Sequence, residues 1–288
     1  MATTGTFGGH VLPGTFFIIY SLWWLFHACR SHILKRDKHD NDRRSSSRCG
    51  RCANMVFCRK ALLLEGTIKV LACAIGVVVE GTSAEWKLRD EHGELHGQND
   101  WHHVTMYIFF ALSGVVDILS ETCVKTVPGR NKLYLSLAFA VEGFLFYLHG
   151  HGRHPLDVML HFLLVLAIFG AAVSTFIEMW FPGETFLSFF RVAFTLLQGT
   201  WFYQISFVLF DPRPGAEPWD EDNMLNSTFI TMIFTWHVAL IIVFINVVYA
   251  AMSMYYKCRH GNNTYTTRGN DVELTLEKNG LLEDEFES

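Results

Sequence analysis

Histidine and carboxylate side chains recur inside the long apolar stretches of this 288-residue chain. An ionisable group in a membrane-spanning helix costs on the order of 2.5–3.5 kcal/mol on insertion scales, so each of these groups needs a physical reason. Neutral imidazole and carboxylate are typical ligands of zinc, iron and copper. The candidate ligands of zinc or another transition metal are His103, His149, His161 and His237.

Two carboxylates share helix faces with two of these histidines. Glu142 lies seven residues before His149, and Asp157 lies four residues before His161. Zinc in such a site would lower the pKa of its bound water to about 7, and Glu142 or Asp157 could then act as the general base. The chemistry would be hydrolysis of a lipid-like substrate, although the sequence favours a non-enzymatic function.

The same polar residues fit other roles. They could hydrogen-bond between helices as a structural network, or they could line a path for protons or ions. A haem would need two histidines that face each other at similar depth, and His161 with His237 is the pair we consider for it. A bound metal, a structural network and a proton or ion path therefore all stay open.

The composition indicates that the elements holding these residues are membrane helices. Half of the residues are hydrophobic and 18% are charged, against about 25% charge in soluble domains. Seven apolar stretches could cross a bilayer core, which takes about 20 helical residues. They lack the two-residue alternation of barrel strands, so we expect an all-α, polytopic bundle of seven transmembrane helices within residues 1–256. The helices are expected over about 10–29, 61–81, 102–120, 133–149, 156–180, 186–210 and 228–256, the fourth starting a few residues early.

The basic residues predict the orientation of the bundle. Ten Lys or Arg lie in the segment 30–60, which is expected to be a cytoplasmic loop. The N-terminus is then exoplasmic or lumenal and the C-terminus cytoplasmic, which places 17 Lys or Arg on the cytoplasmic side and four outside. A net charge of -5 argues against nucleic acid as a partner. The lipid bilayer and other membrane proteins are the expected partners.

Two motifs lie outside the helices. The tail 257–288 is polar and acidic, so it is expected to be disordered and cytoplasmic. Within it, Glu277, Leu281 and Leu282 fit an acidic dileucine sorting signal, E-x-x-x-L-L, which would bind clathrin adaptors. Asn226 begins an Asn-Ser-Thr glycosylation sequon on the exoplasmic side, close to the seventh helix.

Charged residues also occur in the inner halves of the helices. Glu65 and Lys69 form an i, i+4 pair that neutralises itself, and Asp117 has no partner that spacing predicts. Arg191 is expected to extend towards the cytoplasmic surface.

Several motifs in combination resemble the transmembrane protein 45 family, over about residues 8–256. They include Gly9-His-Val-Leu-Pro-Gly-Thr-Phe-Phe, Trp101-His-His-Val-Thr-Met-Tyr, Glu142-Gly-Phe-Leu-Phe-Tyr-Leu-His-Gly-His, Gln198-Gly-Thr-Trp-Phe-Tyr-Gln-Ile and Trp236-His237. Epididymal transmembrane proteins belong to the same broader group.

The resemblance implies a multi-pass membrane protein of the Golgi, endosomes and lysosomes, with the plasma membrane as an alternative location. The resemblance does not by itself imply an enzymatic activity. The leading hypothesis is a protein that acts in membrane-protein trafficking or as an interaction partner. The basic loop 30–60 and the dileucine tail depart from what relatives would show, so sorting by that tail would be individual to this chain.

Overall fold

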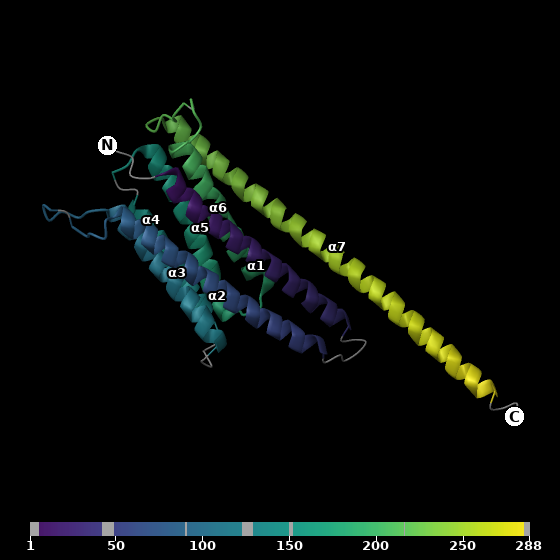
Figure 1. Cartoon of the computed structure of the whole chain (residues 1–288). Helices are drawn as coiled ribbons and strands as arrows, with labels where there is room; N and C mark the ends of the chain where they lie inside the picture. The colour runs from purple at the N-terminus through teal and green to yellow at the C-terminus, as the bar shows by residue number, and fades with distance from the viewer. Residues whose placement is uncertain are drawn as a thin grey trace.

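The structure is a computed structural model. It describes residues 6–41, 49–89, 91–122, 129–149, 152–215 and 217–284, and within these ranges the side chains of 36–41, 49–59, 149 and 260–284 are outside the description. Seven helices make up almost all of this part of the chain (Figure 1). They are α1 (Phe7–Asn41), α2 (Cys49–Ser83), α3 (Gln98–Thr122), α4 (Arg130–His149), α5 (Pro155–Trp180), α6 (Thr185–Leu209) and α7 (Met224–Asp284).

Six of the helices are long and apolar enough to cross a membrane; they are all but α4. α4 is the shortest of the seven, and it carries Arg130, Lys132 and Glu142. It packs between α3 and α5. The chain is therefore a multi-pass helical membrane protein, as its composition predicts, and α4 is the one helix of the described residues that is not among the candidate spans.

Several helices run further than the apolar stretches that predict them. α4 begins at Arg130, before residue 133, as expected. α1 continues to Asn41 and α2 begins at Cys49, so much of the segment 30–60 is helical and not a loop. Apolar composition locates the part of a helix that lies in lipid, whereas a helix can continue into water where its polar side chains are solvated.

The backbone of α7 is helical as far as Asp284, beyond residue 257, where the sequence predicts a disordered tail. The side chains from residue 260 onwards lie outside the described residues, so the boundary at 257 stays a prediction. The interval 42–48 between α1 and α2 is also outside the description.

α5 lies at the centre of the bundle. It packs against α4, α6 and α7, while α1 packs against α6 and α7. The core is accordingly built largely from α5 and α6, and it includes the fully buried side chains of Leu160, Ile168 and Trp201. α2 packs along α3, and in the described residues its backbone does not pack along α1.

Two glycine pairs allow helix backbones to approach closely. A Cβ on Gly66 of α2 would lie 2.8 Å from the carbonyl oxygen of Gly114 on α3. A Cβ on Gly14 of α1 would lie 2.9 Å from the carbonyl oxygen of Gly199 on α6. Small residues at such contacts are typical of membrane helices, whose association depends on close packing.

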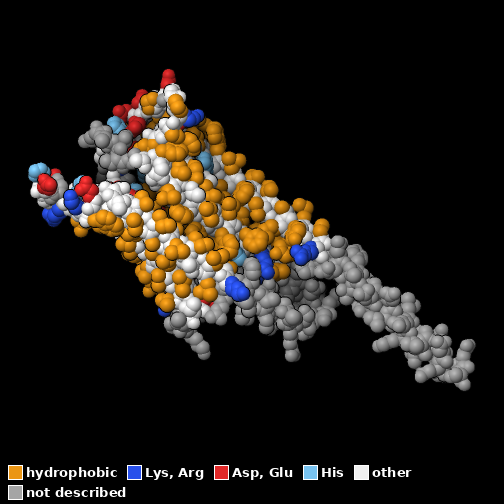
Figure 2. Space-filling model, in the orientation of Figure 1, with side chains coloured by type: hydrophobic (Ala, Val, Ile, Leu, Met, Phe, Trp, Pro, Cys, Tyr) orange, Lys and Arg blue, Asp and Glu red, His pale blue; other side chains and the backbone are white. Residues whose placement is uncertain are grey.

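The surface has the distribution of a membrane protein. Figure 2 shows hydrophobic side chains over most of the visible side of the bundle, with acidic side chains gathered near the end where α7 begins and basic ones at both ends. Exposed apolar residues include Leu71, Ile75, Leu240 and Val243. In a membrane these residues contact lipid or another protein.

Candidate functional site

The helix ends that are predicted to be exoplasmic enclose a small cavity with polar groups in its wall. Its volume is about 50 Å³, and its walls come from α1, α3, α4 and α6. His10, His103 and Glu142 line it together with aromatic side chains such as Phe146 and Phe202. Of the candidate residues of the sequence analysis, His103 and Glu142 line this cavity, and each has its own partner.

Glu142 bonds to an amide. Its Oε1 accepts a 2.6 Å hydrogen bond from the Nε2 of Gln198 on α6, and both side chains are buried. The second carboxylate oxygen of Glu142 and the amide oxygen of Gln198 have no hydrogen-bond partner in the described residues. A buried acceptor without a donor is costly, so this pair is the feature of the cavity that most needs an explanation.

The carboxylate of Asp157 contacts His161 and a neighbouring arginine. The Nδ1 of His161 lies 2.6 Å from one carboxylate oxygen of Asp157, and Arg153 donates a 3.0 Å hydrogen bond to the other. The ring of His10 stands edge-on to that of His161, at 5.9 Å between centroids. The i, i+4 register of Asp157 and His161 thus predicts their contact correctly.

His103 and His237 have partners on other helices. The Nδ1 of His103 is 3.3 Å from Glu80 on α2. On α7, the Nδ1 of His237 is 3.2 Å from the hydroxyl of Thr200, and its ring contacts Trp201 edge-on at 5.4 Å. These two histidines and His161 are therefore held by three different partners.

Among the described side chains, no three or more His, Cys, Asp or Glu lie in an arrangement that could hold a metal ion. A hydrolytic zinc site needs three protein ligands around one centre, and His103, His161 and His237 do not provide it together. The side chain of His149 lies outside the described residues, so its part in any site stays a prediction. What the described geometry does show is a set of interhelical pairs.

The inner half of the bundle contains two buried charge clusters. Lys69 donates a 2.7 Å hydrogen bond to Asp117 on α3, and its Nζ lies 3.9 Å from Glu65. The expectation that Lys69 and Glu65 neutralise each other is thus incomplete, because the closer partner of Lys69 is Asp117. Spacing within one helix could not reveal a bond between α2 and α3.

Arg191 does not extend to the surface as expected. It is buried, and its Nε donates a 2.7 Å hydrogen bond to Glu178 on α5. Lys132 of α4 lies 3.2 Å from the same carboxylate, and the guanidinium of Arg191 stacks over Trp24 of α1 at 4.3 Å. One carboxylate therefore ties α4, α5 and α6 together, and buried charges of this kind persist when they are paired.

An ion pair joins two loops outside the spans. His154 precedes α5, and its Nδ1 lies 3.1 Å from Asp222 in the loop before α7. The hydrogen bond to Asp222, followed by the charge of Asp222, raises the pKa of His154 above its ordinary value of 6.5. The backbone N–H of Leu156 also donates to the carbonyl of Glu221, which fixes the same loop.

The remaining motifs lie at the two ends of α7. Asn226 is in its first turn, half-buried, and its side-chain amide donates a 2.9 Å hydrogen bond to the carbonyl of Asp220. Glu277, Leu281 and Leu282 fall in the last turns of α7, and their side chains lie outside the described residues. Glycosylation of Asn226 and sorting by the dileucine both stay predictions.

The sequence analysis missed Asn246 of α7. It lies in an apolar helix, is exposed on the side of the bundle, and bonds back to the carbonyl of Ile242 at 2.8 Å. A single asparagine within a long apolar stretch is a visible signal, but only the fold shows which way it faces. The pairing of Glu142 with Gln198 was missed for the same reason.

Comparison with known proteins extends these findings. A model described as a family of unknown function (DUF716) matches residues 128–250. The chain is 25% identical over 265 residues to transmembrane epididymal protein 1A of Mus musculus, and 26% identical over 264 residues to transmembrane epididymal protein 1 of Rattus norvegicus. Each alignment covers 88% of this chain and 83% of the relative.

The human transmembrane epididymal protein 1 is 30% identical over 160 residues, which is 55% of this chain and 58% of the relative. The expected relation to epididymal transmembrane proteins is thus confirmed, and the narrower resemblance to the transmembrane protein 45 family stays a prediction. The chain is a multi-pass membrane protein that is similar over most of its length to the transmembrane epididymal proteins.

Proposed function

We propose that this chain is a non-enzymatic membrane protein of the Golgi and endosomal–lysosomal system that acts in trafficking by binding other membrane proteins. The observation that carries the binding role is the position of Asn246. It lies on the outer surface of α7, 13 residues before Arg259, where the apolar span ends. At 1.5 Å per residue this is about 20 Å along the helix, well inside a hydrocarbon core about 30 Å thick.

An amide that faces lipid is incompletely satisfied. One N–H of Asn246 bonds to the carbonyl of Ile242 in its own helix, which leaves further donor and acceptor capacity in the side chain. Polar residues in membrane helices commonly hydrogen-bond to a neighbouring helix, and small residues beside them let the backbones approach. Ala239, Val243 and Ala250 are exposed on the same face as Asn246.

The bundle's own contacts use a neighbouring side of α7. Ile241 and Ile245 pack into the core of the bundle, whereas Asn246 is exposed, so its face is left for a second helix. Meanwhile Asp117 and Glu178 of the inner half are each paired with lysine or arginine of another helix. That pairing supports a role of the inner polar residues in holding the bundle together.

The setting of this function rests on the sequence. The excess of Lys and Arg between α1 and α2 supports a lumenal N-terminus and a cytoplasmic C-terminus, with seven crossings that include α4. The resemblance to the transmembrane protein 45 family supports the Golgi and endolysosomal compartments. The acidic dileucine at Glu277, Leu281 and Leu282 would be on the correct side for clathrin adaptors.

The experiment is the native mass of the full chain extracted from cell membranes in a mild detergent. We expect a complex larger than one chain, reduced to a smaller mass in Asn246→Leu. Thr67→Val on α2 is the matched control, because that exposed hydroxyl is satisfied by the carbonyl of Leu63 in its own helix at 2.8 Å. An unchanged mass in Asn246→Leu, or an equal loss in Thr67→Val, would contradict the proposal.

A further inference from the structure

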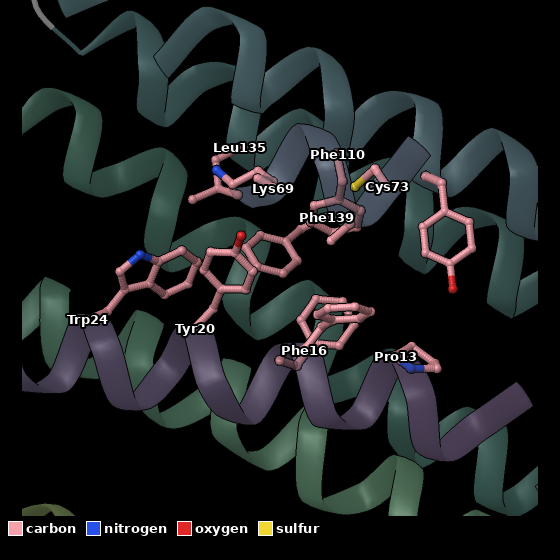
Figure 3. A pocket seen from close by; sticks show the side chains of 12 residues that line it. Pro13, Phe16, Tyr20, Trp24, Lys69, Cys73, Phe110, Leu135 and Phe139 are labelled. Carbon is pink, nitrogen blue, oxygen red and sulfur yellow. The ribbon is translucent and has the colours of Figure 1, made fainter. Parts of the chain in front are cut away.

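An apolar crevice separates α1 from α2. Its volume is about 60 Å³, and aromatic residues of α1, among them Phe16 and Tyr20, form one wall (Figure 3). Ala72 and Cys73 of α2 lie on the opposite wall, and Phe139 of α4 is at the base. Several of these side chains, including Phe16, Tyr20 and Ala72, are only half-buried, so the crevice is open at the surface of the bundle.

The crevice adjoins the cavity that holds Glu142. Pro13, Phe17, Tyr107 and Phe110 line both of them. A molecule with its body between α1 and α2 would therefore have its end next to the carboxylate of Glu142. From Pro13 to Trp24 the crevice follows about 16 Å of helix, close to half of a hydrocarbon core about 30 Å thick. That length matches a lipid chain in one leaflet.

Glu142 differs from the other carboxylates of the helix interiors. Asp117, Asp157 and Glu178 each have a lysine or arginine partner. Glu142 is only 2% exposed, its single hydrogen bond comes from the amide of Gln198, and its Oε2 has no partner in the described residues. The Oε1 of Gln198 is likewise without a donor. Two buried acceptors beside a crevice that is open at the surface of the bundle call for a ligand that donates hydrogen bonds.

We propose that the crevice binds a single-chain membrane amphiphile whose head group, an amine or a hydroxyl, donates hydrogen bonds to Glu142 and Gln198. The apolar chain lies between α1 and α2. An amine would also supply the positive charge that the other buried carboxylates receive from lysine or arginine. A hydroxyl would satisfy the same acceptors without a charge. This inference concerns a different face of the bundle from Asn246 and stands independently of the proposed function.

The test uses the full chain in nanodiscs at neutral pH with three probes: a long-chain amine, the matching alcohol and the matching carboxylic acid, each with the same photoreactive group in its chain. We expect the amine or the alcohol to label peptides of α1 and α2, and the acid to label them much less. Ala72→Phe fills the crevice and should abolish this labelling. Ala74→Phe is the matched control, because Ala74 is exposed on the same helix.

Glu142→Gln separates the two head groups. If the ligand is an amine, labelling by the amine falls by about tenfold in this variant, which corresponds to about 1.4 kcal/mol. If it is an alcohol, labelling by the alcohol survives Glu142→Gln and is lost in Glu142→Leu, because an amide oxygen can still accept a hydrogen bond. Equal labelling by all three probes, or labelling that Ala72→Phe leaves intact in a variant that elutes as wild type, would overturn the proposal.

Discussion

Glu142 and Gln198 form a 2.6 Å hydrogen bond between α4 and α6, two helices whose backbones do not pack against each other in the described residues. α5 packs against both of them. The bond therefore closes the bundle over its central helix, at the end where the polar cavity lies. Because both side chains are buried, neither can exchange this bond for one with water.

This pairing predicts non-additive effects on stability. Gln198→Leu leaves the carboxylate of Glu142 buried with no donor and should lower the free energy of unfolding by about 1–3 kcal/mol. The double variant Glu142→Leu, Gln198→Leu should cost less than the sum of the two single variants, since it removes both polar groups. Thermal unfolding in detergent, followed by size-exclusion chromatography, measures all three. Additive effects would show that the pair is not coupled.

The charge cluster around Lys69 predicts that loss of the lysine destabilises the protein more than loss of one of its carboxylate partners. Lys69→Met leaves the buried carboxylate of Asp117 and the half-buried one of Glu65 without their cation, and we expect the free energy of unfolding to fall by about 3–5 kcal/mol. Asp117→Asn keeps Lys69 beside Glu65, at 3.9 Å, and should cost clearly less. The same melting assay ranks the two variants. Equal losses would mean that Glu65 does not share the charge of Lys69.

The ion pair of His154 and Asp222 predicts a pH dependence of the loop contact. The pKa of His154 is raised in the folded chain, so its stabilisation is complete below the ordinary value of 6.5 and is lost as the pH rises through the raised value. Asp222→Asn should return the pKa of His154 towards 6.5. Titration of the His154 ring by NMR in detergent measures the shift, and an unaltered pKa in Asp222→Asn would contradict the assigned cause.

The sequence predicted the class of the fold well because lipid imposes simple rules. Apolar length fixes where a helix crosses, and the seven stretches fall within α1 to α7 apart from one residue at the end of the sixth. Partners in the same helix, such as Asp157 and His161, follow from the i, i+4 register. The sequence did not predict that α1 ends at Asn41 or that α2 begins at Cys49. Apolar length shows where a helix crosses the bilayer, but it does not show how far the helix continues into water.

The sequence could not predict which side chains of different helices contact each other. Asp117 with Lys69, Arg191 with Glu178 and Glu142 with Gln198 are 48, 13 and 56 residues apart. No periodicity within one helix connects them, since the rotation of each helix in the bundle decides which side chains meet. His161 and His237, which the sequence pairs as possible haem ligands, contact different partners, Asp157 and Thr200, and their pairing stays a prediction.

The acidic dileucine motif predicts that the protein is kept in internal membranes. Replacing Leu281 and Leu282 by Ala should move the protein from internal membranes to the cell surface, because adaptors would lose the apolar side chains that they bind. Surface biotinylation of intact cells measures the change. The control replaces Leu274 and Leu276, which lie in the same tail outside the motif. If both double variants behave as wild type, the motif does not sort the protein.

The central claim is that α7 binds another membrane protein through the face of Asn246, and site-specific photocrosslinking in living cells tests it most directly. A photoreactive residue replaces Val243 on that face or, as the control, Leu71, an exposed residue of α2. The account predicts a discrete protein adduct from position 243 that disappears when Asn246→Leu is added, and no such adduct from position 71. Only lipid adducts at both positions would contradict it.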